Sequence, residues 1–215
     1  EVNMGATAIG TSINANAKYL KKVVFYLNKF SGEELKGAKN LIDATRHLDS
    51  FCYASSMLKI TAVDLSKIAS DLRLMSLLHE IKLPILQPGS SIMPGKYNPV
   101  VPETVNQVAF YIMGLDVTVT NAVEAVQLEL NVFTPVILMT LFEEITTLRR
   151  AARTFRSAAI EQLEANVDML RVNAENSVSL ATVLAPHIGY DVACDIINEA
   201  LETNESVKEI AIKRK

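Results

Sequence analysis

The chain has 215 residues, of which 49% are hydrophobic, so it can bury a substantial core as one large domain or two small ones. Its 21 basic and 24 acidic residues leave a net charge of -3, with a basic run only at residues 213–215, which disfavours a nucleic-acid partner. Charged residues interrupt every apolar stretch before the roughly 20 residues that a membrane helix needs, so we expect no membrane partner.

The cysteines and the first residues bear on the cellular compartment. Cys52 and Cys194 lie in apolar, helix-like stretches, which predicts buried thiols in a reducing cytoplasm rather than a disulfide framework. The chain opens with Glu1-Val2-Asn3 and shows no charged and apolar leader, which is typical of an interior piece of a longer polypeptide. We therefore expect a cytoplasmic protein.

The first half predicts a loop followed by helices. Residues 1–14 read as a loop, Asn14 as the cap of a helix over 15–30, and Ser31-Gly32 as its end. No proline or glycine interrupts residues 40–76, and small or apolar residues recur there in steps of three and four, which predicts one long helix in a bundle. These residues are Leu41, Ala44, Leu48, Cys52, Ser55, Leu58, Ala62, Leu65, Ile68, Leu72 and Met75.

The second half predicts further helices and no long strand. Pro102 and Glu103 are typical of a first helical turn, and the apolar stripe that follows predicts a second long helix as far as Leu130. Residues 131–135 predict a break, followed by helices over 136–157 and from 158 to about 169. Shorter helices are expected over 177–184, 190–202 and 206–212, so the predicted fold class is all-α.

Polar residues are unusually frequent along the second long helix. They are Asn106, Gln107, Asn121, Glu124, Gln127 and Asn131. Such groups must be satisfied by partner chains or by water in a cleft, and three long helices from one chain leave apolar faces open. We therefore expect a homo-oligomer.

Residues 89–98, which we call the motif loop, connect the two long helices. Prolines at 84, 88, 94, 99 and 102 exclude regular helix there, while Gly89 and Gly95 permit unusual backbone angles. The loop carries two hydroxyls, an ammonium and a carboxamide, which together could bind a carboxylate; backbone N–H groups around Gly89 could add an anion-binding nest. These groups belong to Ser90, Ser91, Lys96 and Asn98.

The run GSSIMPGKYNP resembles the GSSxMPxKxNP signature of the aspartase/fumarase superfamily. The resemblance implies a long-helix bundle with a smaller C-terminal helical unit. It implies a central domain over 1–171, the start of the C-terminal domain over 172–215, and an N-terminal domain of the family upstream of this chain. It also implies a homotetramer whose active sites are shared between subunits.

Residues 71–76, 98–108 and 124–132 are most similar to the aspartate ammonia-lyase branch. That branch implies reversible elimination of ammonia from L-aspartate to give fumarate through an aci-carboxylate intermediate, without a cofactor. Two alternatives stay open, namely a fumarate hydratase of the same superfamily and a non-catalytic helical assembly fragment. Because the family's other two catalytic regions would lie upstream of Glu1, we expect the isolated chain to be inactive.

The resemblance also implies residue roles. Ser90 is the expected general base, and Ser91 is expected to contact the carboxylate on which charge builds up. Lys96 and Asn98 are expected to hold the α-carboxylate. Glu103 is expected to pair with a histidine from a neighbouring subunit, although a glutamate in a first helical turn also stabilises the helix by itself.

Other candidate residues predict little chemistry. None of the three histidines stands in the family's Gly-x-Thr-His context, and each is more simply a packed or surface residue. Glu143-Glu144 is interpreted as a solvated helix face. No metal or nucleotide motif is present. The family usually has about six further residues after Ser76 that this sequence lacks.

Overall fold

The computed structural model describes residues 1–89, 91–203 and 205–214, and the chain divides into two compact units. The first comprises 1–70 and 100–157, and the second comprises 71–99 and 158–215. Helices dominate both units, which confirms the expected all-α class. The division expected at residues 171 and 172 stays a prediction. Within the described ranges, no helix is both long and apolar enough to cross a bilayer.

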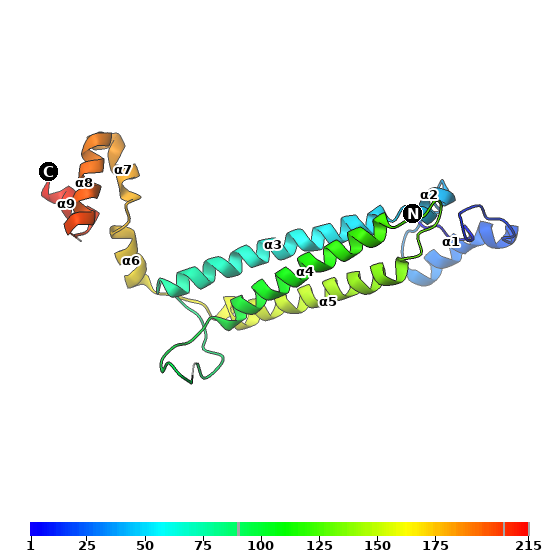
Figure 1. The fold of residues 1–215 in the computed structure, drawn as a ribbon, viewed down its shortest axis with the longest axis horizontal. Coiled ribbons are helices and arrows are strands. Elements are labelled where there is room, and N and C mark those ends of the chain that lie inside the picture. The colour runs from blue at the N-terminus through cyan, green and yellow to red at the C-terminus, as the bar shows by residue number, and fades with distance from the viewer. Residues whose placement is uncertain (90, 204, 215) are drawn as a thin grey trace. The chain divides into compact units, whose positions relative to one another are not determined.

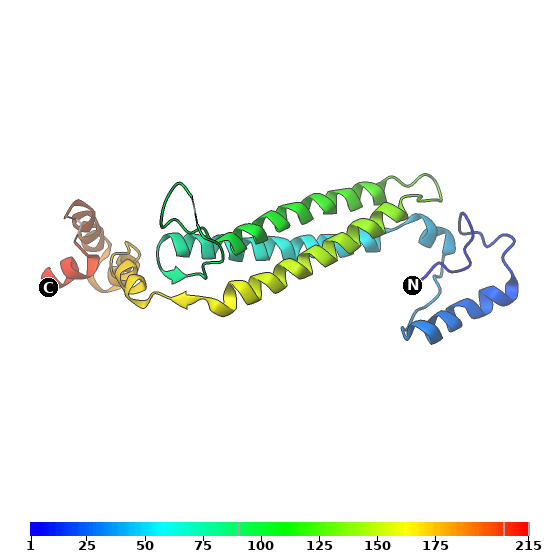
Figure 2. The ribbon, with the colours of Figure 1, turned by 90° about the horizontal axis from the view of Figure 1, so that it is seen from below.

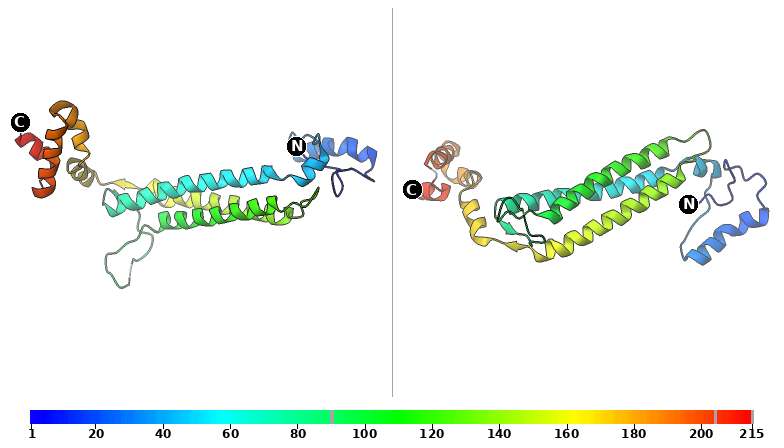
Figure 3. Two further views of the ribbon diagram at one scale, coloured as in Figure 1. Left: turned by 45° about the horizontal axis from the view of Figure 1, so that its top comes forward. Right: turned by 60° about the horizontal axis from the view of Figure 1, so that its bottom comes forward.

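Three long helices form the body of the first unit: α3 (Asp49–Leu77), α4 (Val100–Glu124) and α5 (Thr134–Ala158). They lie side by side, and the chain reverses direction from each to the next (Figures 1 and 3). The buried residues of α3 are Ser55, Ala62 and Ala69, which repeat every seven residues. Side chains this small let the neighbouring helices approach closely along one seam.

All three helices contribute to the core of this bundle. Ala62 of α3 packs in one cluster with Ala109 and Ile112 of α4 and Leu148 of α5. A second cluster joins α4 to α5 through Val119, Ala122, Ile137 and Leu141. The predicted bundle of long helices is therefore confirmed.

Two helix boundaries at the N-terminal end differ from the prediction. Helix α1 (Ala17–Ser31) is capped by Asn16, whose side chain accepts from Lys18 N–H, and not by Asn14, which has a left-handed φ of 64°. The single helix expected over 40–76 is broken into α2 (Leu41–Arg46) and α3. His47 ends α2 with extended backbone and bonds to Asp43, yet the next residue, Leu48, still packs against the bundle core.

Helix α4 ends at Glu124 and not at Leu130, because a later side chain caps it. Asn131 donates from Nδ2 to the carbonyls of Ala122 and Val123 at 3.0 and 3.2 Å. Asn106 likewise donates to the carbonyl and hydroxyl of Ser66 at 2.9 Å. These two polar side chains are therefore satisfied within the chain, without the partner chain or water cleft expected for them.

The second unit contains a small sheet that the sequence did not predict. Strand β1 (Ile81–Lys82) pairs antiparallel with β2 (Glu164–Ala165), drawn as arrows in Figure 2. The helix expected from residue 158 to about 169 is therefore wrong. That stretch contains η1 (Ile160–Gln162), then β2, and only then α6 (Val167–Glu175), which Asn166 caps.

Three helices end the chain: α7 (Leu180–Ile188), α8 (Tyr190–Thr203) and α9 (Val207–Lys213). Their core contains Ile196, Ala200, Val207 and Ile210. Ser206 and Glu209 form a complete capping box at the start of α9, as expected for a helix beginning there. Pro186 lies inside α7 and does not stop it.

A buried polar cluster interrupts the apolar bundle. Glu144 of α5 is 0% exposed, and its Oε1 accepts from Ser55 Oγ at 2.8 Å, whereas Oε2 has no hydrogen-bond partner in the described part of the chain. Asp116 of α4 accepts from Lys59 Nζ at 2.5 Å and from Ser56 Oγ at 3.2 Å. The interpretation of residues 143 and 144 as a solvated face is therefore wrong for Glu144.

Burial raises the pKa of Glu144, and the negative charge of Asp116 raises it further, against the opposing effects of Ser55 and Lys59. Between the ordinary value of 4.5 and the raised value, the folded state binds more protons than the unfolded state. The free energy of unfolding should therefore fall as pH rises through this window, and the full cost persists above it.

We expect Glu144→Gln to remove this cost, because glutamine keeps the bond to Ser55 and cannot ionise. The gain above the window should be about 1.4 kcal/mol for each unit by which the pKa is raised. Urea unfolding from pH 5 to 8 measures it. Glu143→Gln is the matched control, since Glu143 is exposed and bonds to Tyr111 at the surface. Equal pH slopes for wild type and Glu144→Gln would contradict the prediction.

Candidate functional site

The motif loop closes on itself through its first glycine. Gly89 and Gly95 both have φ of 82°, which other residues rarely adopt. A Cβ at Gly89 would lie 2.8 Å from the Lys96 carbonyl oxygen and 3.2 Å from the Tyr97 ring, whereas a Cβ at Gly95 would have nothing within 4 Å. The two limbs of the loop therefore meet at Gly89, and Tyr97, for which the sequence offered no role, packs there.

The structure describes four of the five predicted site residues. Ser91, Lys96 and Asn98 are exposed on the motif loop, where Lys96 N–H donates to the Met93 carbonyl at 3.2 Å in a tight turn. Glu103 is half-buried in the first turn of α4, as its position predicted. The proposed base, Ser90, lies outside the described residues.

A hollow of about 400 Å³ lies at the base of the motif loop. Its lining includes Ser76, His79, Ile81 and Lys82 before the loop, and Gly95, Tyr97, Asn98 and Pro99 on its returning limb. Among the predicted binding residues, Asn98 contributes to this lining, whereas Ser91 and Lys96 do not. Sequence reasoning missed the contribution of Lys82, a cation placed by β1.

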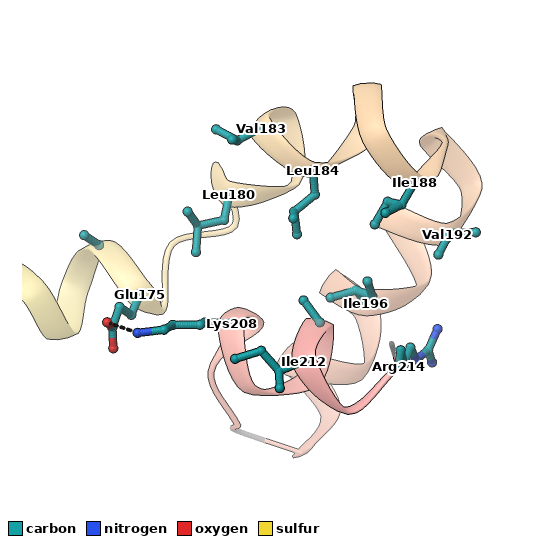
Figure 4. A pocket seen from close by; sticks show the side chains of 12 residues that line it. Glu175, Leu180, Val183, Leu184, Ile188, Val192, Ile196, Lys208, Ile212 and Arg214 are labelled. Carbon is teal, nitrogen blue, oxygen red and sulfur yellow. Dashed lines mark hydrogen bonds and ion pairs between the residues drawn. The ribbon is translucent and has the colours of Figure 1, made fainter.

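A second hollow, of about 460 Å³, lies among the C-terminal helices (Figure 4). Its lining is mainly aliphatic and includes Leu180, Leu184, Ile188 and Ile196, which Figure 4 shows around the opening between α7, α8 and α9. The charged Lys208 is paired with Glu175 at 2.5 Å, and Arg214 is paired with Glu199. This hollow offers a mainly apolar surface whose charged residues are paired with one another or with Glu199.

The histidines and cysteines gather at no common centre. His47 pairs with Asp43 at 2.7 Å, His79 lines the first hollow, and His187 is in the last turn of α7. Cys52 and Cys194 are free thiols, as expected, but they are half-buried where full burial was predicted. Throughout the described ranges, histidine, cysteine and acidic side chains form no group of three or more that could hold a metal ion.

The described part of the motif loop therefore presents hydrogen-bond donors at its surface. Ser91, Lys96 and Asn98 provide an O–H, an ammonium and an amide donor, a set that suits the binding of carboxylate oxygens. Their exposure leaves room for further groups to complete a binding site around them. The chemistry supported by this unit alone is thus the orientation of an anion.

Two family models match the chain. One, described as Lyase, matches residues 1–114, and another, described as Fumarase C C-terminus, matches residues 180–215. Together they include the motif loop and the three helices that end the chain.

Curated relatives match almost the whole chain. An aspartate ammonia-lyase of Bacillus sp is 44% identical over 99% of the chain, and one of Pseudomonas aeruginosa is 48% identical over all of it. These alignments cover 47% and 46% of the two relatives. The chain therefore spans about half the length of the curated relatives it matches.

Solved structures match in fold as well as in sequence. A fumarate lyase:delta crystallin from Brucella melitensis has a TM-score of 0.92 and 46% identity over all of this chain and 48% of its own. A class II fumarase from Schistosoma mansoni has a TM-score of 0.88 and 31% identity over 98% of this chain and 48% of its own. The fold of this chain is thus one that solved structures also have.

We expect Gly89→Ala to destabilise the protein more than Gly95→Ala. Both changes force a left-handed alanine, which costs about 1–2 kcal/mol, but only alanine at 89 also meets the Lys96 carbonyl, which adds about 1–3 kcal/mol. Urea unfolding and limited proteolysis within residues 83–99 measure the difference. Equal losses for the two variants would mean that the limbs do not meet at Gly89.

Proposed function

We propose that this chain, which belongs to the lyase family of the aspartase/fumarase superfamily, is the central and C-terminal part of an aspartate ammonia-lyase. The observation that carries the proposal is the 44–48% identity to aspartate ammonia-lyases over nearly the whole chain, motif loop included. The whole protein would eliminate ammonia from L-aspartate and release fumarate.

The reaction begins with loss of a proton from the carbon next to the side-chain carboxylate. We assign Ser90 as the base that takes this proton. The electron pair left behind moves into the carboxylate and gives the aci-carboxylate dianion, which Ser91 would stabilise by hydrogen bonding. The pair then returns to form the carbon–carbon double bond as the C–N bond breaks and ammonia departs. Donors fixed before the charge develops lower this barrier most.

Binding of the other carboxylate falls to Lys96 and Asn98. An ammonium and an amide donor give charge-assisted contacts that are present in the ground state and in the transition state alike. Glu103, half-buried in the first turn of α4, would pair with a histidine of a neighbouring subunit. The role proposed for Glu103 therefore requires a second chain.

The surface of the bundle supports a homotetramer. Large apolar side chains stay exposed along all three long helices of the isolated chain, among them Met57, Ile60, Phe110, Met139 and Phe142. Large apolar side chains exposed in such number are typical of an interface between subunits. We also place the protein in the cytoplasm, because free thiols such as Cys52 and Cys194 are typical of a reducing compartment.

Two alternatives differ in testable ways. A fumarate hydratase would act on malate, and the 31% identity to a class II fumarase supports this substrate less than the higher identities support aspartate. A non-catalytic assembly fragment would act on neither. Fumarate absorbance after addition of aspartate or of malate to the whole protein separates the three. Absorbance with malate alone would refute the proposal, and so would none with either.

The loop variants should separate chemistry from binding. In the whole protein, Ser90→Ala should lower kcat by about 10²–10⁴-fold with little change in KM, because the base is lost and the carboxylate contacts stay. Lys96→Ala should raise KM by about 10–100-fold, because a charge-assisted contact is lost. Lys29→Ala, an exposed lysine at the end of α1, is the charge-matched control. An unchanged kcat for Ser90→Ala would show that Ser90 is not the base.

Assembly should depend on the exposed side of the bundle. We expect the chain to have a tetramer's mass by light scattering, and Phe142→Lys to lower that mass by placing a charge on the apolar face of α5. Phe30→Lys, the same change at an exposed phenylalanine of α1, should keep the tetramer. A wild-type monomer at micromolar concentration would count against assembly through the bundle.

A further inference from the structure

The chain leaves α3 through a turn that has a histidine where glycine is usual. Glu80 N–H donates to the Met75 carbonyl at 2.9 Å, and His79 N–H donates to the Ser76 carbonyl at 3.2 Å, which is the Schellman pattern. His79 occupies the left-handed position with φ of 58°. A Cβ makes this conformation unfavourable, so the turn depends on contacts from elsewhere to hold it.

Asn166 makes those contacts from a distant part of the sequence. Its Nδ2 donates to the His79 carbonyl at 2.9 Å, and its backbone N–H donates to the Glu80 carbonyl at 2.8 Å. Its Oδ1 accepts from Met169 N–H at 3.4 Å, which caps α6. One asparagine therefore joins the end of α3 to the start of α6.

Two neighbouring interactions extend this junction within the same unit. Asn173 of α6 donates from Nδ2 to Glu80 Oε1 at 3.0 Å. Directly after the turn, β1 pairs with β2, with Ile81 opposite Ala165. Ile81 is 5% exposed, so the strand is anchored by burial as well as by its ladder.

The turn and β1 form part of the lining of the hollow at the base of the motif loop. His79, Ile81 and Lys82 contribute to it from this side, and Tyr97 and Asn98 contribute to it from the returning limb. A shift of the turn would thus change the shape of the space that Asn98 faces. Asn166 itself is not among the lining residues.

We propose that Asn166 is a positioning residue for the motif loop. By donating to the carbonyls of His79 and Glu80, it fixes the turn and β1, and through them the hollow that Asn98 lines. Its effect on turnover rests on the proposed function, in which Asn98 holds the α-carboxylate. Its effect on the order of the loop does not.

The test separates the donor of Asn166 from its role as a helix cap. Asn166→Asp and Asn166→Ser keep an acceptor that caps α6 but lack the amide donor to His79. In the whole protein, backbone amides of residues 83–99 should exchange hydrogen about fivefold to tenfold faster in both variants, since one hydrogen bond is lost. Amides of α5 should exchange as in wild type. KM for aspartate should rise by a similar factor, with kcat changed less.

The matched control is Asn40→Asp. Asn40 caps α2 by accepting from Ile42 and Asp43 N–H, so aspartate can replace it in the contacts that the structure describes. Exchange in 83–99 and KM should both stay at wild-type values. If residues 83–99 exchanged hydrogen at the wild-type rate in both Asn166 variants, Asn166 would act only as the cap of α6, and the proposal would be overturned. Faster exchange with an unchanged KM would also overturn it. Failure of the whole protein to deaminate aspartate would refute the proposed function, while exchange still decides the role of Asn166.

Discussion

Close packing of three long helices is the constraint on which the first unit depends. Ser55, Ala62 and Ala69 repeat once per heptad on α3, and their small side chains let α4 and α5 approach that face. The larger residues of α4 and α5, such as Ile112 and Leu148, then fill the space between the helices. The motif loop belongs to the segment of chain that connects α3 to α4.

The same packing explains the balance between buried and exposed groups. Three helices can bury only one face each, so residues such as Phe110 and Phe142 stay at the surface of the isolated chain. At the same time, the bundle encloses Glu144 and Asp116, which are costly to bury. Asp116 has Lys59 as its counterion, whereas Glu144 has only the Ser55 hydroxyl in the described part of the chain. Burial raises the pKa of Glu144, and the nearby charge of Asp116 raises it further.

The motif loop combines a close approach of its two limbs with exposed side chains. The two limbs of the loop meet at Gly89, and a hydrogen bond from Lys96 N–H to the Met93 carbonyl closes a turn at its tip. The side chains of Ser91, Lys96 and Asn98 are nevertheless exposed. Such an arrangement suits a loop that supplies part of a site and leaves the rest to other chain segments. Asn166 matters in this context because it ties the turn that precedes the loop to the start of α6, through the backbone carbonyls of His79 and Glu80.

The sequence by itself determined the all-α class, the long helices and the helix ends that local residues specify. Gly32 ends α1 as predicted, because such a cap depends on neighbouring residues only. The order of residues in GSSIMPGKYNP also sufficed to indicate the family. Periodicity failed where the apolar stripe continued through a break, as at Leu48, which faces the core without being helical.

Only the tertiary structure decided contacts between residues far apart in the chain. Pairing of β1 with β2 turned part of a predicted helix into a strand, and Asn131 ended α4 six residues before its stripe ended. Burial separated Glu144 from Glu143, two identical neighbours in sequence, because rotation about the α5 axis points one into the bundle and the other into solvent. Asn166 likewise gained its partners from the fold, since His79 lies 87 residues away in sequence.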